Sequence, residues 1–187
     1  MKQRWLIGIV CLCCACTQYT PKPRGFMRLE PPTPHYLSFN LSDLPYRFNV
    51  SSLAEIELPP ENTNENWINI AYPSLGGKVY CSYIPITPAT LARIEEESRE
   101  LVQRQAKRTE VISEVAYTNP EEQVFGSLFL LDGESAAPIQ FMLTDSNRRF
   151  FRGSLLYNIR PNADSLAPVT RYLQADIIEF MQSFRWN

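Results

Sequence analysis

The chain has 187 residues, of which 44% are hydrophobic, which is enough for one sizeable core and too little for two ordinary domains. Eighteen Lys and Arg against 20 Asp and Glu give a formal charge of -2, so no excess positive charge is present to bind nucleic-acid phosphates. A single histidine and seven glycines exclude a His-based metal cage and argue against the glycine-rich loops that bind nucleotides. We therefore expect one domain with no metal, no cofactor and no nucleic-acid partner.

The N-terminus has the features of a secretion signal. Lys2 and Arg4 precede an apolar run of twelve residues that ends at Cys16, whereas a membrane-spanning helix needs roughly 20. Ala15-Cys16 fits the end of a bacterial lipoprotein signal, in which lipid is transferred to the cysteine thiol before cleavage. We predict a lipoprotein signal peptide over residues 1–15 and lipidation at Cys16.

The four N-terminal cysteines have two other interpretations. They are filler in a plain signal peptide, or they are zinc ligands, although the CxCCxC spacing leaves no room for a tetrahedral cage. Cys13 also stands where the lipoprotein motif usually has Leu. Lipidation remains the favoured interpretation because the charged start, the apolar run and the small residue before Cys16 occur together.

Residues 16–35 are predicted to form a lipid-anchored, proline-rich lead. Eight of the fifteen prolines lie between Thr17 and Pro60, and this density favours extended backbone over helix. The simplest role of such a segment is to hold a domain away from a lipid surface.

Residues 36–187 are predicted to form a single domain. Apolar and alternating runs predict strands within 36–50 and over 67–72, 78–84, 111–118, 124–131, 138–144 and 149–160. Gly76-Gly77 predicts a hairpin turn, and Thr87-Pro88 predicts the start of a helix that continues to about residue 108. A closing helix follows Asp164, with an apolar stripe that reaches Phe184. This order predicts an α+β fold, in which an antiparallel sheet has helices packed on it as an α/β/α sandwich.

The sequence offers little for catalysis. His35, the sole histidine, lies in the proline-rich lead, so neither a Ser-His-Asp nor a Cys-His arrangement is indicated. Cys81 occupies an alternating strand, which predicts a buried core residue. Asp132, Glu134 and Asp145 fall in turns, where Asp commonly binds local backbone; a hydrolase or metal site built from them is the alternative.

Arg152 is the candidate functional cation near the last turn. It shares a strand face with Ser154 and Asn158, and we expect it to form an ion pair across the strands, with a binding role as the alternative. Trp67, Tyr80 and Trp186 are the aromatic candidates for a contact surface.

Several short sequences occur in a characteristic order along the chain. They are Tyr19-Thr20-Pro21-Lys22-Pro23-Arg24-Gly25, Trp67-Ile68-Asn69-Ile70, Ser82-Tyr83, Asn119-Pro120, Gln140-Phe141, Leu143-Thr144-Asp145-Ser146, Phe151-Arg152-Gly153, Pro161-Asn162, Asp164-Ser165-Leu166-Ala167-Pro168-Val169 and Ser183-Phe184 with Trp186. In these segments the chain resembles the gliding-motility lipoprotein GldD family over nearly all of its length after Cys16. The predicted strand order is also similar to the Mog1/PsbP-like sandwich.

The resemblance implies a cell-envelope lipoprotein needed for gliding motility and associated with type IX protein secretion. It acts through contacts with other envelope proteins, with no enzyme activity and no small-molecule substrate. Residues matched to the family and accessible to a partner form the predicted docking set: Tyr19, Pro21, Lys22, Pro23, Arg24, Gly25, Trp67, Asp145 and Arg152. A periplasmic binding module for a small ligand or a peptidoglycan fragment is the alternative function, and it requires a pocket with converging polar groups.

The expected location is the cell envelope, with the protein lipid-anchored and facing the periplasm. Thr17 after the lipid cysteine provides no aspartate retention signal, and no acidic run follows it. The outer membrane is therefore favoured over the inner membrane.

Overall fold

The computed structural model describes residues 32–60, 65–106, 109–133, 135–158 and 163–187. Its strands are β1 (Tyr36–Asn40), β2 (Tyr46–Ser51), β3 (Glu55–Glu57), β4 (Ile68–Tyr72), β5 (Gly77–Pro85), β6 (Thr109–Asn119), β7 (Val124–Gly133), β8 (Ile139–Thr144), β9 (Arg149–Tyr157) and β10 (Arg185–Trp186). Its helices are α2 (Pro88–Gln105) and α3 (Ala163–Ser183), and the 3-10 turn η2 (Pro73–Leu75) joins β4 to β5. The order agrees with the prediction, and the short strands β3 and β10 are additions to it.

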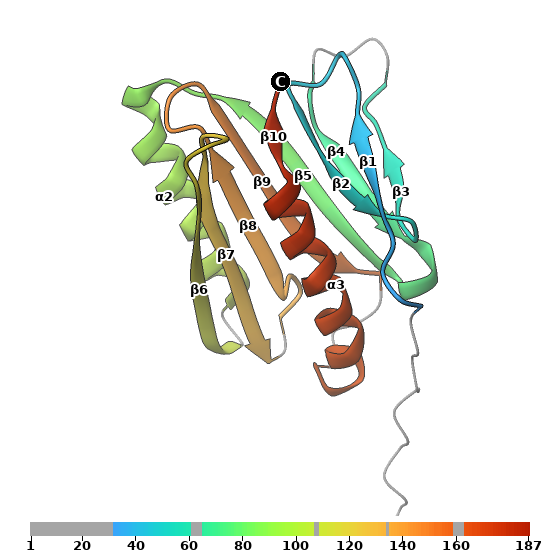
Figure 1. Cartoon of the computed structure of the whole chain (residues 1–187). Helices are drawn as coiled ribbons and strands as arrows, with labels where there is room; N and C mark the ends of the chain where they lie inside the picture. Colours follow the sequence, from blue (N-terminus) through green and yellow to red (C-terminus); the bar gives the residue numbers. More distant parts are fainter. Residues whose placement is uncertain (1–31, 61–64, 107–108, 134, 159–162) are drawn as a thin grey trace, which may run out of the picture.

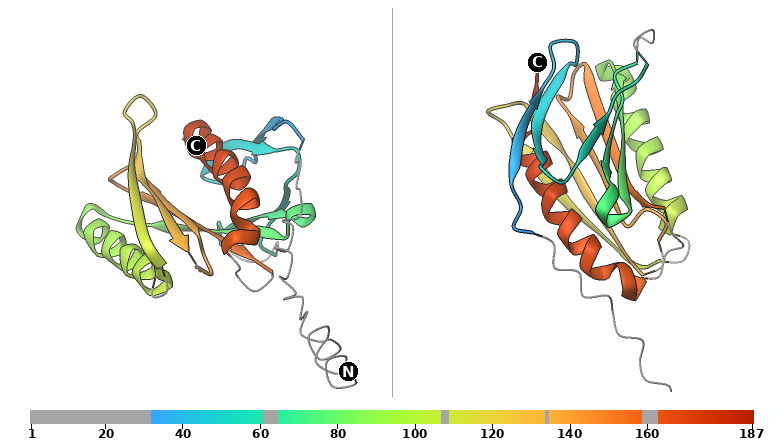
Figure 2. Two further views of the ribbon diagram at one scale, coloured as in Figure 1. Left: turned by 90° about the horizontal axis from the view of Figure 1, so that it is seen from below. Right: turned by 90° about the vertical axis from the view of Figure 1, so that its right-hand side faces the viewer.

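Seven strands form one sheet in the order β3-β4-β5-β9-β8-β7-β6, and every neighbouring pair is antiparallel. Helix α2 covers one face of this sheet, and α3 lies against the other face (Figure 1 and Figure 2). A second sheet, β1-β2-β10, lies beside α3 and contacts it mainly through β2. The predicted α+β class, with helices on both faces of an antiparallel sheet, is confirmed, and the second sheet is a new feature.

Local signals set the element boundaries. Gly76 has a φ of 64°, a left-handed conformation that glycine adopts without steric cost, and it turns the chain from η2 into β5. Thr87 caps α2 in a capping box with Thr90, whose side chain accepts the Thr87 backbone N–H at 2.9 Å. Pro88 occupies the first helical position, where its missing N–H costs little. The predicted hairpin and the predicted helix start are therefore confirmed.

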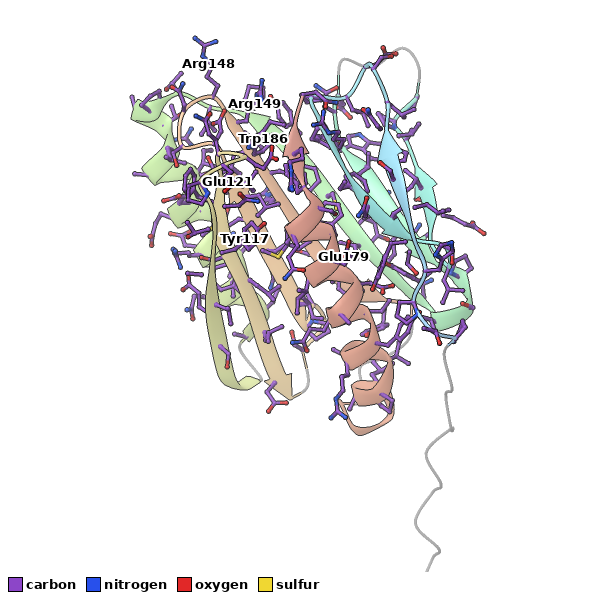
Figure 3. All side chains as sticks on the ribbon, in the orientation of Figure 1. Tyr117, Glu121, Arg148, Arg149, Glu179 and Trp186 are labelled. Carbon is purple, nitrogen blue, oxygen red and sulfur yellow. The ribbon has the colours of Figure 1, made fainter. Side chains whose placement is uncertain are left out.

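Strand β10 fastens the C-terminus onto β2. Trp186 pairs with Tyr46 across the strands, and its indole N–H donates to the carbonyl of Gln123 at 3.1 Å. The guanidinium of Arg149 lies 5.8 Å from the centre of the Trp186 ring, and Figure 3 shows both residues at the same end of the molecule. The turn after β6, the turn before β9 and the C-terminus therefore meet at that end.

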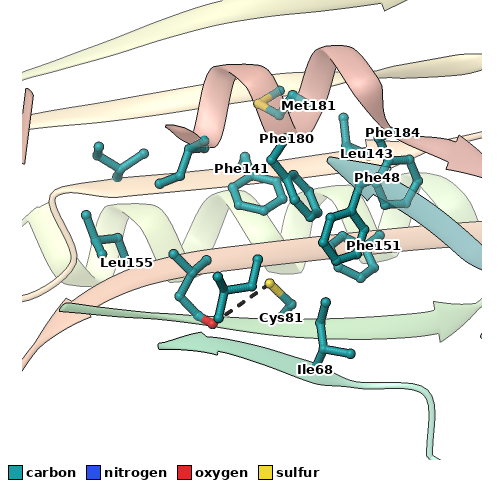
Figure 4. Packing of buried hydrophobic residues seen from close by; sticks show 14 of the residues in the cluster. Phe48, Ile68, Cys81, Phe141, Leu143, Phe151, Leu155, Phe180, Met181 and Phe184 are labelled. Carbon is teal, nitrogen blue, oxygen red and sulfur yellow. Dashed lines mark hydrogen bonds between the residues drawn. The ribbon is translucent and has the colours of Figure 1, made fainter. Parts of the chain in front are cut away.

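Aromatic rings fill the space between the large sheet, α3 and β2 (Figure 4). The centroids of Phe48 and Phe180 lie 4.4 Å apart, and Tyr46 meets Phe151 edge-on at 4.7 Å. Phe184 completes the group at 5.2 Å from Phe151. Because each aromatic side chain of this kind buries roughly 150–250 Å², the cluster joins β2, β9 and α3 into one core.

Gly153 provides space for a ring in that core. It lies in cross-strand register between Cys81 of β5 and Phe141 of β8. A Cβ atom at this position would lie 2.4 Å from Cε1 and Cζ of the Phe141 ring, which is far inside van der Waals contact. The absence of a side chain at residue 153 therefore lets the Phe141 ring lie across β9.

A smaller apolar cluster lies under α2. Ile94 and Val102 of the helix pack with Phe129, Met142 and Phe150 of the sheet. The same face of the sheet continues beyond the helix onto β5, β4 and β3, where it includes the partly or fully exposed polar side chains of Lys78, Tyr80, Asn69 and Glu57. The long edge of α2 therefore borders an open, polar part of the sheet.

Candidate functional site

The structure describes only part of the predicted docking set. Cys16 and the docking residues of segment 19–25 lie outside the described residues. Trp67 directly precedes β4, Asp145 follows β8, and Arg152 lies within β9. Alternation along antiparallel strands places Trp67 and Arg152 on the same face of the sheet, the α2 face. Asp145 instead lies in the turn at the end where Trp186 is found.

Asp145 organises the turn between β8 and β9. Its Oδ1 accepts the backbone N–H groups of Asn147, Arg148 and Arg149 at 2.9, 2.8 and 2.9 Å. This local pattern is typical of Asp in turns. Asp145 therefore binds the backbone of its own turn, as its position in the sequence predicted. A docking role for Asp145 stays a prediction.

Trp67 is half-buried and engaged with its own loop. Its indole N–H donates to Oε2 of Glu65 at 2.6 Å. The ring retains an accessible surface beside β4, so its docking role also stays a prediction.

Arg152 differs from the sequence-based expectation. Its cross-strand neighbours are Ser82 on β5 and Met142 on β8, and neither is a carboxylate. Among the described residues its guanidinium forms no ion pair and no hydrogen bond. The predicted ion pair across the strands is therefore wrong within this part of the chain, because the register places neutral side chains opposite Arg152.

Arg152 lines a groove between α2 and the strands β5, β9 and β8. The groove encloses about 190 Å³. Its floor contains two adjacent cross-strand rows, one of Tyr80, Ser154 and Gln140 and the other containing Ser82 and Arg152. Five side chains that can form hydrogen bonds thus line the groove from the sheet, and no Asp or Glu lines it.

The wall of the groove is apolar. Leu101 and Val102 of α2 line it from the helix side, and Phe129 and Met142 line it from the sheet. Val102, Phe129 and Met142 belong to the cluster under α2, so this wall is fixed by core packing. The groove therefore combines a firm apolar side with a polar floor.

Gln140 is the most unusual residue of the groove. It is 6% exposed, and its Oε1 accepts the hydroxyl of Ser154 at 3.4 Å. Its amide nitrogen, Nε2, is buried and has no hydrogen-bond partner among the described residues. Buried polar atoms in native proteins nearly always have a partner, and leaving one without costs about 1–3 kcal/mol. This donor is therefore available to a bound group.

The turn carboxylates do not form a catalytic pair. Asp132 lies beside the start of β8 and Asp145 follows its end, so the six residues of β8 separate them by roughly 20 Å. Glu134 lies outside the described residues. The described part of the chain also holds no group of three or more His, Cys, Asp or Glu side chains placed to bind a metal ion.

Cys81 is buried, as predicted. It is 2% exposed, and burial raises the pKa of its thiol. The thiol therefore stays protonated at neutral pH, which makes it a poor nucleophile. His35 is exposed at the edge of the domain, and no described residue forms a catalytic arrangement with it.

A buried carboxyl group lies on the face of the sheet opposite to the groove. Asp176 of α3 is 3% exposed, and its Oδ1 accepts the hydroxyl of Tyr36 at 2.9 Å. Burial raises the pKa of Asp176, while nearby hydroxyls of Tyr36, Ser51 and Tyr72 act in the other direction. This acid links α3 to β1, β2 and β4 and is closed off from the groove by the sheet.

Gln140 and Asp176 are the residues that reasoning from the sequence missed. Gln140 is a polar residue within the apolar run of β8, and this exception to the pattern could have indicated a functional residue. Asp176 lies three residues after Leu173 and four before Phe180, so helical spacing places it on the buried stripe of α3.

Taken together, these features define an α+β domain with a polar groove at the edge of α2. No helix among the described residues has the length and apolar character needed to span a membrane. The chain belongs to the gliding-motility lipoprotein GldD family, whose model matches residues 16–186. Membership of this lipoprotein family implies association with the cell envelope and a part in gliding motility.

A search of curated proteins finds no match. Among solved structures, the chain is similar to the solution structure of cyanobacterial PsbP (CyanoP) from Synechocystis sp. PCC 6803, with a TM-score of 0.45 and 8% sequence identity. The similarity covers 81% of this chain and 92% of that chain.

Proposed function

We propose that this protein is a lipid-anchored accessory component of the gliding and type IX secretion machinery that acts through protein–protein contacts. The observation that carries the proposal is the family match, which begins at Cys16 and continues to residue 186. The lipid cysteine, the proline-rich lead and the folded domain thus fall within one family match. The groove and buried core of the domain are consistent with a binding role.

The anchor is the first part of the proposal. Cys16 follows a charged start and a short apolar run, and acyl chains on it contribute roughly 0.8 kcal/mol of membrane binding per buried CH2 group. Cells fed labelled palmitate are expected to label the unaltered protein and Cys14→Ala, and to leave Cys16→Ala unlabelled. Persistent labelling of Cys16→Ala would contradict the anchor assignment.

The docking segment is the second part. Tyr19 to Gly25 is polar and rich in proline, and Lys22 and Arg24 offer two positive charges to an acidic partner surface. Replacement of residues 19–25 by Gly and Ser, with Cys16 kept, is expected to abolish gliding while palmitate labelling and protein level stay unchanged. A strain that glides normally with this replacement would show that the segment is only a spacer.

The location is the third part. We propose that the lipid is held in the outer membrane and that residues 36–187 face the periplasm as one folding unit. Separation of inner and outer membranes by density is expected to recover the protein with the outer membrane. Protease added to intact cells is expected to leave it uncut, and cleavage in intact cells would place the domain on the cell surface instead.

A further inference from the structure

We propose that the groove between α2 and the strands β5, β9 and β8 binds the C-terminal carboxylate of a peptide whose last residue has a small apolar side chain. The site does not depend on Cys16 or on the segment 19–25, so it goes beyond the anchored docking function proposed above. Three observations carry it: an unpaired cation, an unpaired buried donor and a firm apolar wall.

The cation is Arg152. Its guanidinium has five N–H donors in a planar arrangement that matches a carboxylate, and none of them is used within the described residues. Two carboxylates on the same face of the sheet are already bound: Glu57 to Lys78 at 2.7 Å, and Glu114 to Arg99 at 2.6 Å. Since no Asp or Glu lines the groove, the positive charge of Arg152 is available to an anion from solvent.

The buried donor is Nε2 of Gln140. Ser154 occupies the other end of the Gln140 amide, which holds the side chain in place with its nitrogen unpaired. Gln140 and Arg152 lie on the adjacent strands β8 and β9, in neighbouring cross-strand rows. A carboxylate has two oxygens, so one group can accept from both side chains.

The rest of the groove fits a peptide end better than a bare ion. The hydroxyls of Ser82 and Tyr80 can donate and accept, which is what the last peptide group of a chain requires. Leu101 and Val102 provide an apolar surface beside them, sized for a small side chain within the 190 Å³ of the groove. Tyr80 is 44% exposed, so the groove opens to solvent where the remainder of a peptide would leave it.

The test uses the full chain, purified in detergent and titrated by calorimetry. The probe is N-acetyl-alanyl-alanine, and its C-terminal amide is the matched ligand that lacks the charge. We expect the acid to bind tenfold or more tightly than the amide, because hydrogen bonds to a charged group are the stronger ones. Equal binding of the two, or no binding of the acid at millimolar concentration, overturns the proposal.

Two variants locate the site. Arg152→Gln is expected to weaken acid binding by about 30-fold, since it removes a charge-assisted contact. Arg148→Gln removes an exposed arginine from the neighbouring turn and is the matched control, expected to change binding less than twofold. Unchanged binding by Arg152→Gln, or an equal loss in Arg148→Gln, contradicts the assignment.

Gln140→Met separates binding from folding. Methionine has a similar shape without the unpaired donor, so this variant is expected to melt at a higher temperature while it binds the acid about tenfold more weakly. A variant that is more stable and binds as tightly as the unaltered chain would show that Nε2 plays no part.

Inorganic phosphate is the last ligand to be tested. Phosphate that binds as tightly as the peptide acid would make this a general anion site and overturn the peptide assignment.

Discussion

The hydroxyl of Tyr36 donates to Oδ1 of Asp176 at 2.9 Å, although 140 residues separate the two positions in the chain. Tyr36 begins β1, and Asp176 lies in the middle of α3. This hydrogen bond joins the first strand of the domain to its last helix. Two predictions concern this contact and the elements that it joins.

Asp176 is expected to favour the folded state more at low pH than at neutral pH, which is the reverse of the usual effect of a carboxylate. Burial raises the pKa of its carboxyl in the folded state above the unfolded value of about 3.9. The folded state therefore holds the proton more tightly, so this group stabilises the fold as pH falls through the folded pKa and opposes it at neutral pH. We compare the unfolding free energies of the unaltered chain and of Asp176→Asn. The value for the unaltered chain minus the value for the variant is expected to increase as the pH is lowered from 7 to 4.

The measurement is urea unfolding at a series of pH values. Asp43→Asn removes one exposed carboxylate and is the matched control for the change in net charge. A difference between the unaltered chain and Asp176→Asn that stays flat, or that falls with decreasing pH, would show that the carboxyl is not shifted upward.

The N-terminal boundary of the domain is expected to lie before β1. A chain of residues 32–187 is expected to unfold at nearly the same temperature as the full chain, because β1 and every strand after it are retained. A chain of residues 52–187 loses β1 and β2, and with them Tyr46 and Phe48, which contact Phe151 and Phe180. Circular dichroism is expected to show cooperative melting only for the longer chain. Cooperative melting of the shorter chain would place β1 and β2 outside the folding unit.

Gly153 is expected to resist substitution. Gly153→Ala forces a Cβ to within 2.4 Å of the Phe141 ring, and overpacking of this kind costs about 1–3 kcal/mol. Urea unfolding measures the loss. The double variant Gly153→Ala with Phe141→Leu is expected to lose less than the two single variants together, because the smaller side chain relieves the clash. Additive losses would mean that the two residues do not interact.

Trp186 is expected to hold the C-terminal strand in place. Its ring lies at 4.8 Å from that of Phe184, and its N–H bonds to the carbonyl of Gln123. Trp186→Ala is expected to lower stability by about 2 kcal/mol, whereas Trp186→Phe, which keeps an aromatic ring, is expected to lose about 1 kcal/mol. Thermal melting of the three proteins checks the order, and equal losses in the two variants would show that only the hydrogen bond matters.

Sequence patterns predicted the elements with strong local signals. β5 alternates cleanly, Thr87 and Pro88 start α2 with a cap, and Gly76 turns the hairpin. β3 and β10 have only three and two residues, too few for an alternation to be seen. β3 forms by pairing with β4, and β10 forms by pairing with β2, which is far from it in the sequence. Short strands of this kind depend on tertiary contacts, which a local pattern does not contain.

The groove could not be predicted from the sequence either, because it also depends on tertiary contacts. Arg152 was recognised as a candidate, but its neighbours depend on the register of three strands, and that register placed Ser82 and Met142 beside it. Gln140 lies under a helix that comes from another part of the chain. Neither the absence of a carboxylate opposite Arg152 nor the unpaired amide of Gln140 follows from spacing alone.

The described chain enters the domain at the end opposite to β10 (Figure 1). The carbonyl of Pro32 accepts the Tyr172 hydroxyl at 3.4 Å in the middle of α3, whereas Trp186 pairs with Tyr46, the first residue of β2. With Cys16 anchored as proposed, sixteen residues of reach allow at most roughly 55 Å between the lipid and Pro32. A tether of this length limits the distance between the domain and the membrane that holds Cys16, and it attaches at the end of the domain remote from β10 (Figure 1).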